Sequence, residues 1–199
     1  MVRDLEEIKR RLEAYALENG VPIIRRSERE GLLSAASLAD PGRILEIGTA
    51  IGYSSLLLAE AFPEAEIDTI ELDPSRHQMA EEVMKEAGFS ERVHCHLGDA
   101  GKVLETLFGP YDFVYLDGPK GQYLKELLMI EDKLAEKAVI AADNVLFRGL
   151  VRSEGKVPHR YRTLVMRLRD YISYVESSYD TKIYEDGDGL AVSIKKGNV

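Results

Sequence analysis

The stretch ILEIGTAIGYSS, residues 44–55, decides the fold. A short apolar run stops at Gly48, and a turn with a second glycine, Gly52, leads into an apolar segment that favours a helix from about Tyr53. Glycines let the backbone approach a ligand closely, and a helix start presents unpaired N–H groups. A strand, a tight turn and a helix start in this order predict a pocket for a nucleotide-like ligand. An ordinary strand–turn–helix joint without a ligand would give the same pattern.

The spacing of the two glycines indicates which nucleotide to expect. Gly48-x-x-x-Gly52 lacks the three glycines of the dinucleotide fingerprint, and no Gly-Lys-Ser/Thr of a P-loop follows. The carboxylate of Glu46 would repel a pyrophosphate, whereas it suits a ligand that carries an ammonium or sulfonium group. The sign of this charge favours S-adenosylmethionine over NAD as the cofactor.

The composition predicts one domain over residues 1–199, because 45% apolar residues in a chain of this length can bury a substantial core. The N-terminal stretch is charged and amphipathic, and no apolar run of 18 residues occurs. We therefore expect a cytoplasmic protein without a membrane segment. The single cysteine, Cys95, excludes an internal disulfide and a zinc site built on cysteine pairs. The net charge of -9 argues against general affinity for nucleic acid, although it says nothing of local patches.

Apolar strands alternate with helices through the middle of the chain. The strands that we expect run over residues 43–47, 66–70, 92–97, 112–116 and 138–142. The helices that we expect run over about residues 53–62, 74–87, 101–107 and 121–135. Such alternation predicts an α/β fold, in which a parallel sheet is covered on both faces and ligands lie at the carboxyl ends of the strands.

The two ends of the chain complete the predicted domain. Within residues 1–40, a helix over 4–19 and another from a capping box at Ser27 and Glu30 to about Ala39 would cover the sheet and the cofactor site. A helix over 159–173 would lead into strands over 174–178, 181–185 and 190–195, with a turn at 186–189. The turn predicts a terminal antiparallel hairpin, which Rossmann-like methyltransferases also use.

Two acidic residues at strand ends suit the nucleoside of such a cofactor. Glu71 ends the second strand, where a carboxylate can accept hydrogen bonds from both ribose hydroxyls. Asp99 follows the third strand and can reach an adenine amino group. Each residue has an ordinary alternative, which is a cap or solvated charge for Glu71 and a helix N-cap for Asp99. The assignment therefore depends on their combination with the glycine turn.

Oxygen-bearing side chains end the next two strands. Asp117 follows the fourth strand, and Asp143 and Asn144 follow the fifth, so all three converge at one edge of a parallel sheet. Three hard oxygen ligands suit Mg2+ or a similar divalent ion rather than zinc. Lys120 is the candidate base or electrostatic partner for a substrate hydroxyl whose pKa the ion lowers. A strand-end aspartate is also common as a turn or cap residue, and Lys120 could be a solvated loop lysine.

Together, ILEIGTAIGYS, TIELD, YLDGPKGQY and ADNV resemble the metal-dependent O-methyltransferases related to catechol and caffeoyl-CoA O-methyltransferases. The resemblance implies a seven-stranded, Rossmann-like class I methyltransferase fold and a homodimer. The S-adenosylmethionine-binding residues that it implies are Glu46, Gly48, Ser54, Glu71, Asp99 and Ala100. It also implies Asp117, Asp143 and Asn144 as metal ligands, with Asp117 and Lys120 as the catalytic residues. The ion would chelate two neighbouring substrate oxygens, and Lys120 would be the base.

Within this family, residues 117–123 and 143–149 are most similar to the bacterial tRNA methyltransferases that convert 5-hydroxyuridine at the wobble position to 5-methoxyuridine. A 5-hydroxyl beside the C4 carbonyl offers two adjacent oxygens, as catechol does. The pair Gly118-Pro119 departs from the two alanines expected there. The resemblance therefore does not predict the rim of the site on the substrate side. A small catechol-type acceptor is the alternative, and a non-catalytic protein that binds S-adenosylmethionine or RNA is a third interpretation.

A basic segment after the fifth strand gives a separate argument for tRNA. Residues 148–169 contain seven Lys or Arg and one acid, Glu154, so the segment is +6 and the remainder of the chain -15. The candidate RNA-binding residues are Arg148, Arg152, Lys156, Arg160 and Arg162. An RNA backbone would lie here if its base entered the site. The alternative is a solvated helix whose basic side chains pair with acidic neighbours.

Overall fold

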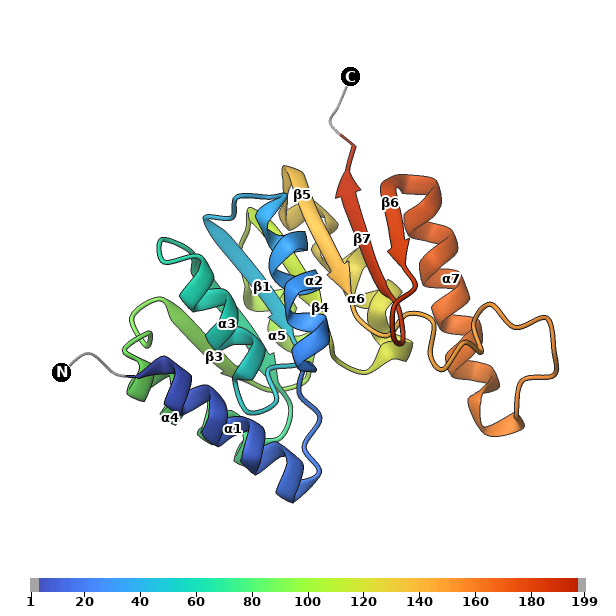
Figure 1. The fold of residues 1–199 in the computed structure, drawn as a ribbon. Helices are drawn as coiled ribbons and strands as arrows, with labels where there is room; N and C mark the ends of the chain where they lie inside the picture. The colour runs from blue at the N-terminus through green and yellow to red at the C-terminus, as the bar shows by residue number, and fades with distance from the viewer. Residues whose placement is uncertain (1–3, 197–199) are drawn as a thin grey trace.

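The computed structural model describes residues 4–196, and a seven-stranded sheet forms its centre (Figure 1). The strands, in the order β3-β2-β1-β4-β5-β7-β6 across the sheet, are β3 (Val93–Leu97), β2 (Glu66–Glu71), β1 (Arg43–Ile47), β4 (Tyr111–Leu116), β5 (Leu134–Ala142), β7 (Leu190–Lys195) and β6 (Tyr179–Tyr184). Strands β1 to β5 are parallel, and β7 is antiparallel to both β5 and β6. The predicted fold class is therefore confirmed. Residues 1–3 and 197–199 of the predicted domain lie outside the described residues.

Helices cover both faces of the sheet. One face carries α1 (Leu5–Asn19), α2 (Arg26–Ser37), α3 (Tyr53–Ala61) and α4 (Pro74–Ala87), and the other carries α5 (Ala100–Thr106), α6 (Tyr123–Ile130) and α7 (Arg162–Ser178). Ile44 belongs to the first apolar cluster and its neighbour Leu45 to the second, because successive side chains of a strand point to opposite faces. Burial on both faces explains why apolar residues follow one another at Ile44 and Leu45 of β1 instead of alternating with polar ones. Within residues 4–196, no helix is long and apolar enough to cross a membrane.

The N-terminal helices lie at two different depths. Helix α2 packs against β5, whereas α1 packs against α4, on the outside of the helix layer (Figure 1). An ion pair of 2.8 Å between Lys9 and Glu60 helps to hold α1 there. The predicted capping box at Ser27 is wrong by two residues, because Arg25 is the N-cap and the carboxylate of Glu28 accepts a hydrogen bond from its backbone N–H.

Two predicted elements differ from the structure. The helix expected to reach residue 135 ends at Ile130, and a 3-10 turn over Glu131–Lys133 leads directly into β5. The strand predicted over 174–178 is the end of α7. The buried residues of α7 keep the helical spacing through Tyr171 and Val175, so packing outweighs the strand preference of the aromatic and β-branched residues there.

The register of the parallel strands aligns their carboxyl ends. The residues paired across β2, β1, β4 and β5 in the last row of these strands are Ile70, Ile47, Leu116 and Ala142. The residues that follow them are Glu71, Gly48, Asp117 and Asp143. Four of the predicted site residues therefore lie side by side at one edge of the sheet.

Candidate active site

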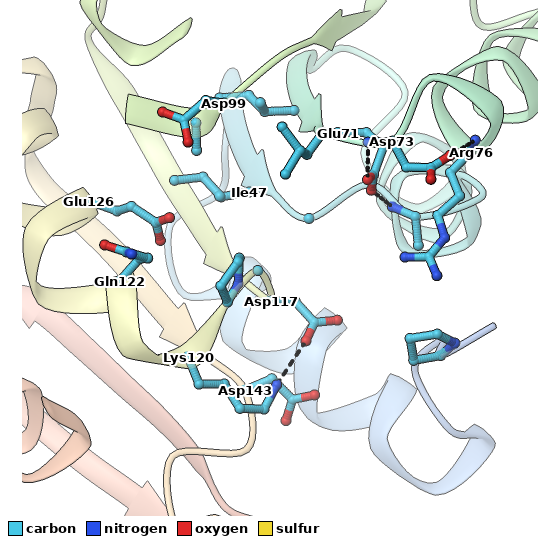
Figure 2. A pocket seen from close by; sticks show the side chains of 18 of the residues that line it. Ile47, Glu71, Asp73, Arg76, Asp99, Asp117, Lys120, Gln122, Glu126 and Asp143 are labelled. Carbon is cyan, nitrogen blue, oxygen red and sulfur yellow. Dashed lines mark hydrogen bonds and ion pairs between the residues drawn. The ribbon is translucent and has the colours of Figure 1, made fainter. Parts of the chain in front are cut away.

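A cavity of about 860 Å3 opens at this edge (Figure 2). Its walls are the strand ends, the segment before α2, the start of α5, and the turn that leads from Lys120 into α6. The predicted site residues that line it are Gly48, Glu71, Asp99, Ala100, Asp117, Lys120, Asp143 and Asn144. Two predicted cofactor residues, Glu46 and Ser54, are not among the residues of its wall.

The glycine turn forms the floor of the cavity between β1 and α3. Gly48 has a φ of +108° and Gly52 a φ of +82°, a backbone region that side-chain-bearing residues adopt at a cost. The N–H groups of Gly48 and Thr49 both donate to the carbonyl of Ile70 at the end of β2. The turn is therefore fixed by backbone conformation and by the neighbouring strand.

Glu71 holds the turn from the side of β2. Its carboxylate accepts a hydrogen bond of 2.8 Å from the N–H of Ala50 and another of 2.8 Å from the N–H of Asp73. Glu71 is buried, so it is not a solvated charge, and the N-cap of the following helix α4 is Asp73. Glu71 lines the cavity, and each carboxylate oxygen has a further lone pair for a ligand hydroxyl.

Glu46 lies beneath the turn. It is fully buried, and its Oε2 accepts hydrogen bonds from the hydroxyls of Ser55 and Thr69. Its other oxygen, Oε1, has no hydrogen-bond partner among the described residues, and burial raises the pKa of this carboxyl. From the sequence, we expect the carboxylate of Glu46 to face the charged group of the ligand. In the structure Glu46 instead supports the turn from beneath and is not part of the cavity wall. Ser54 is likewise buried in the first turn of α3.

The start of α5 forms another part of the cavity wall. Asp99 is the N-cap of α5, and its carboxylate accepts a hydrogen bond of 3.3 Å from the N–H of Lys102. Asp99 and Ala100 also line the cavity. The cap alternative for Asp99 is thus correct, and it leaves one carboxylate oxygen free to face a ligand.

Asp117 and Asp143 meet at the other end of the cavity. Burial, followed by the charge of Asp143, raises the pKa of Asp117 to about 7, and burial also raises the pKa of Asp143. Nζ of Lys120 lies 3.8 Å from Oδ1 of Asp117. Asn144 adopts a left-handed backbone with a φ of +54° and follows Asp143 directly. Two carboxylates that are costly to ionise, together with an amide, form a donor set that a divalent cation fits.

No cluster of three or more His, Cys, Asp or Glu side chains suited to a metal occurs in the described stretch of the chain. The carboxylates of Asp117 and Asp143 therefore need a third ligand of another type. Asn144 supplies an amide oxygen, and water or substrate would complete the shell of a hard cation.

A second cavity of about 390 Å3 adjoins the first, and Ile24, Glu28 and Asp143 line both. Its other walls are α2, the side chain of Tyr115 and the hairpin between β6 and β7. The acidic residues of its wall are Glu28, Glu30, Asp143 and Asp186, and no Lys, Arg or His from the described residues belongs to it. Nothing in the sequence signals that α2 and the hairpin meet at Asp143, so this cavity was not predicted.

The first cavity also has a residue that sequence reasoning missed. Glu126 of α6 is buried, lines the cavity, and has no hydrogen-bond partner for its Oε2 among the described residues. A signal was present, because Glu126 falls in the apolar stripe of α6 with Tyr123, Leu127 and Ile130. A charged residue at such a position is unusual unless it has a ligand or partner.

The basic segment 148–169 lies beside the site, and none of its residues lines either cavity. Arg152 forms an ion pair of 2.7 Å with Glu185, and Arg162 donates to the carbonyl of Val157. Arg148 and Arg160 lie against the ring of Tyr161, and Lys156 is exposed. Some of the segment therefore has the structural role that the alternative interpretation foresaw.

The comparison with protein families agrees with this geometry, since a family model described as O-methyltransferase matches residues 4–196. The chain belongs to the O-methyltransferase family. This O-methyltransferase is 34% identical to a probable O-methyltransferase of Mycobacterium tuberculosis over 73% of its own length and 68% of the relative. It is 32% identical to a catechol O-methyltransferase of Niastella koreensis, over 69% of the chain and 65% of the relative.

Solved structures extend the comparison to the whole domain. A putative caffeoyl-CoA O-methyltransferase from Staphylococcus aureus is 30% identical, with a TM-score of 0.85 over 94% of this chain and 91% of the other. The O-methyltransferase TomG from Streptomyces achromogenes, solved in complex with S-adenosylmethionine, is 26% identical, with a TM-score of 0.83 over 99% of this chain and 93% of the other. By its family, the chain is an S-adenosylmethionine-dependent O-methyltransferase.

Proposed function

We propose that the enzyme methylates one of two neighbouring hydroxyls on a small aromatic acceptor, with a divalent cation such as Mg2+ at Asp117, Asp143 and Asn144. The observation that carries the proposal is the meeting of Asp117 and Asp143 at the edge of the cavity, next to a second, smaller cavity. The relatives named catechol and caffeoyl-CoA O-methyltransferases support it.

The larger cavity would hold the cofactor. Gly48 allows close approach of the nucleoside, Glu71 would accept hydrogen bonds from the ribose hydroxyls, and Asp99 with Ala100 would face the adenine. This arrangement would direct the sulfonium methyl group towards the end of the cavity that Asp117 and Asp143 form. Transfer then depends mainly on orientation of the acceptor oxygen toward the methyl group.

The acidic end of the cavity would handle the acceptor hydroxyls. A bound divalent cation supplies Lewis acidity, which lowers the pKa of a hydroxyl beside it. The carboxylates of Asp117 and Asp143 and the amide of Asn144 are the groups that would hold it. Nζ of Lys120, 3.8 Å from Asp117, is the basic atom that would receive the hydroxyl proton or stabilise the charge left behind.

The second cavity favours a small acceptor over a nucleic acid. It is lined by Tyr115, by apolar residues of α2 and β7, and by four acidic residues. An aromatic ring fits such walls, whereas a phosphodiester would be repelled by the carboxylates because no basic residue of the described wall offsets them. Asp143 joins this cavity to the proposed cation site.

Methyl transfer to catechol, compared with transfer to phenol, tests the proposal. We expect methylated catechol by mass spectrometry, no methylated phenol, and loss of activity in EDTA. Asp143→Ala should abolish transfer and weaken the binding of Mn2+, measured by titration calorimetry, while S-adenosylhomocysteine still binds. Asp132→Asn, at an exposed position, is the control. Full activity of Asp143→Ala or in EDTA would refute the cation site.

The basic segment supports a second acceptor, the 5-hydroxyuridine of tRNA. Arg148 and Arg160 follow the proposed cation ligands in the sequence and lie against the ring of Tyr161. The segment 148–169 as a whole is strongly positive. Nucleoside mass spectrometry of 5-hydroxyuridine tRNA, run beside the catechol reaction, decides between the two. Arg160→Glu should then weaken tRNA binding and reduce its salt dependence. An affinity that stays the same at every salt concentration would remove the argument for tRNA.

The predicted homodimer and cytoplasmic location stay predictions. Sedimentation equilibrium of the purified enzyme tests the first, because a dimer doubles the 22.3 kDa mass of the chain. Fractionation of the producing cells tests the second.

A further inference from the structure

Glu126 is a buried carboxyl that the proposed reaction does not use. It is 4% exposed, it lines the cofactor cavity from α6, and the described residues offer no hydrogen bond to its Oε2. A buried polar atom without a partner costs free energy. Glu126 lines the cavity, so a rotation of its carboxyl would bring this enclosed oxygen to a ligand that satisfies it.

The surroundings of Glu126 indicate which group of a ligand would do so. Asp99 is close enough to raise the pKa of Glu126, and it caps α5, whose start also lines this cavity. Figure 2 shows the carboxyl of Glu126 beside the side chain of Gln122, on the same side of the cavity as Asp99. Two carboxyls on one side of a cavity favour a group with two hydrogen-bond donors.

The cofactor has one neutral group with two donors, which is the 6-amino group of its adenine ring. We propose that Glu126 accepts one hydrogen of this amino group while Asp99 accepts the other, so that Glu126 makes the site selective for adenine over a 6-oxo purine. The proposal depends on the assignment of this cavity to S-adenosylmethionine. A 6-oxygen would instead place an acceptor against two acceptors, which is unfavourable.

The protonation state of Glu126 does not alter its contact with the amino group, but it does alter the selectivity, because only the carboxylate lacks a proton to donate to a 6-oxygen. Burial, followed by the charge of Asp99, raises the pKa of Glu126 to about 7, while Lys125 lowers it. A neutral carboxyl still has a carbonyl oxygen that accepts a hydrogen bond, as the carboxylate does. The amino group therefore has an acceptor at Glu126 in either form.

Calorimetric titration of S-adenosylhomocysteine and S-inosylhomocysteine at about pH 9, where the Glu126 carboxyl is ionised, tests the proposal without an acceptor or a metal ion. The wild-type enzyme should bind the adenosyl compound at least about tenfold more tightly. Glu126→Met should weaken binding of the adenosyl compound about tenfold and should not weaken binding of the inosyl compound, so that the preference falls to the part that Asp99 supplies. Glu126→Gln keeps an acceptor and adds a donor, so it should bind the inosyl compound more tightly than the wild type does.

Two controls keep the outcomes apart. Glu136→Gln removes an exposed carboxyl at the far end of β5 and should leave both affinities unchanged. A Glu126→Met variant with the wild-type ratio of affinities overturns the proposal, as does Glu126→Gln without a gain for the inosyl compound if Glu126→Met does not fold. Failure of the wild type to bind S-adenosylhomocysteine would refute the cofactor assignment itself, which is a different result.

Discussion

Gly48 packs directly against the backbone of Asp117. A Cβ atom on Gly48 would lie 2.7 Å from both the carbonyl carbon and the carbonyl oxygen of Asp117, and the N–H of Asp117 donates to the carbonyl of Ile47. The turn that would hold the cofactor and the strand end proposed to hold the cation are therefore in contact. The distance between methyl donor and acceptor depends on this contact.

Gly48→Ala should damage both functions of the site. The new methyl group would clash with the backbone of Asp117, and the φ of +108° is strained for alanine. We expect a loss on the order of 2 kcal/mol in the free energy of unfolding and weaker binding of S-adenosylhomocysteine. Gly42→Ala is the control, because a Cβ there meets only Asp112 Oδ2 at 3.6 Å. Equal stability of the two variants in urea would contradict the argument.

Tyr123 fixes the end of β5 from the face of the sheet that carries α6. Its hydroxyl donates a hydrogen bond of 3.0 Å to the carbonyl of Asp143, and both residues are buried. Tyr123→Phe leaves that carbonyl without this donor and should cost about 1–3 kcal/mol of unfolding free energy. Weaker binding of Mn2+ should accompany the loss, since Asp143 would be less firmly held.

Tyr171→Phe is a matched control for this prediction. The hydroxyl of Tyr171 is also buried, but the described residues give it no hydrogen-bond partner, and its ring lies 5.7 Å from that of Tyr123. Removing an unpaired buried hydroxyl should be neutral or stabilising. If both variants lose stability equally in urea denaturation, the packing of the buried hydroxyl and not its hydrogen bond explains the effect.

The sequence was sufficient to predict the edge of the sheet on which the site lies. Gly48, Asp117 and Asp143 each follow an apolar strand, and parallel pairing brings such positions together whatever the exact strand bounds. The helix expected over about residues 74–87 is also confirmed as α4, with Asp73 and Gly88 as its caps. Each of these features is indicated by residues that are close together in the sequence, even where the strands that carry them are far apart.

Features that depend on distant contacts were not predictable. Glu46 adjoins the turn in sequence, but its hydrogen bond to Thr69 of the next strand draws it beneath the turn and away from the cavity. The second cavity needs the approach of α2 to the hairpin near Tyr184. The bounds of α7 were misjudged because the burial of Val175 depends on tertiary packing. In each case, the missing information was which elements, distant in the sequence, pack against one another.

Arg169 should hold the loop of the basic segment in place. Its guanidinium donates hydrogen bonds of 2.8 Å to the carbonyl of Val151 and 3.0 Å to that of Ser153. Arg169→Ala should therefore loosen this loop and speed its cleavage after Glu154 by a Glu-specific protease. Arg167→Ala, which loses only a long contact of 3.5 Å to the carbonyl of Gly121, is the control. Equal cleavage rates for the two variants would show that Arg169 does not hold this loop in place.

Glu126 should make stability fall as pH rises. Its pKa is about 7 in the folded protein, against an ordinary value of 4.5, because of burial and then Asp99, with Lys125 acting in the opposite direction. Between these two values the unfolded chain loses the proton while the folded protein keeps it, so the unfolded state is favoured increasingly with pH. Above about pH 7 the cost is complete and is on the order of 3 kcal/mol.

Glu126→Gln should remove this cost, because its side chain is neutral at every pH. Without cofactor, the variant should match the wild type near pH 4 and exceed it in unfolding free energy by an amount that grows up to about pH 8. Urea denaturation across this range measures the difference, and Glu136→Gln, at an exposed position, should show none that depends on pH. A difference between Glu126→Gln and the wild type that is constant with pH would mean that the Glu126 carboxyl titrates normally. It would then have a partner or water in the folded protein.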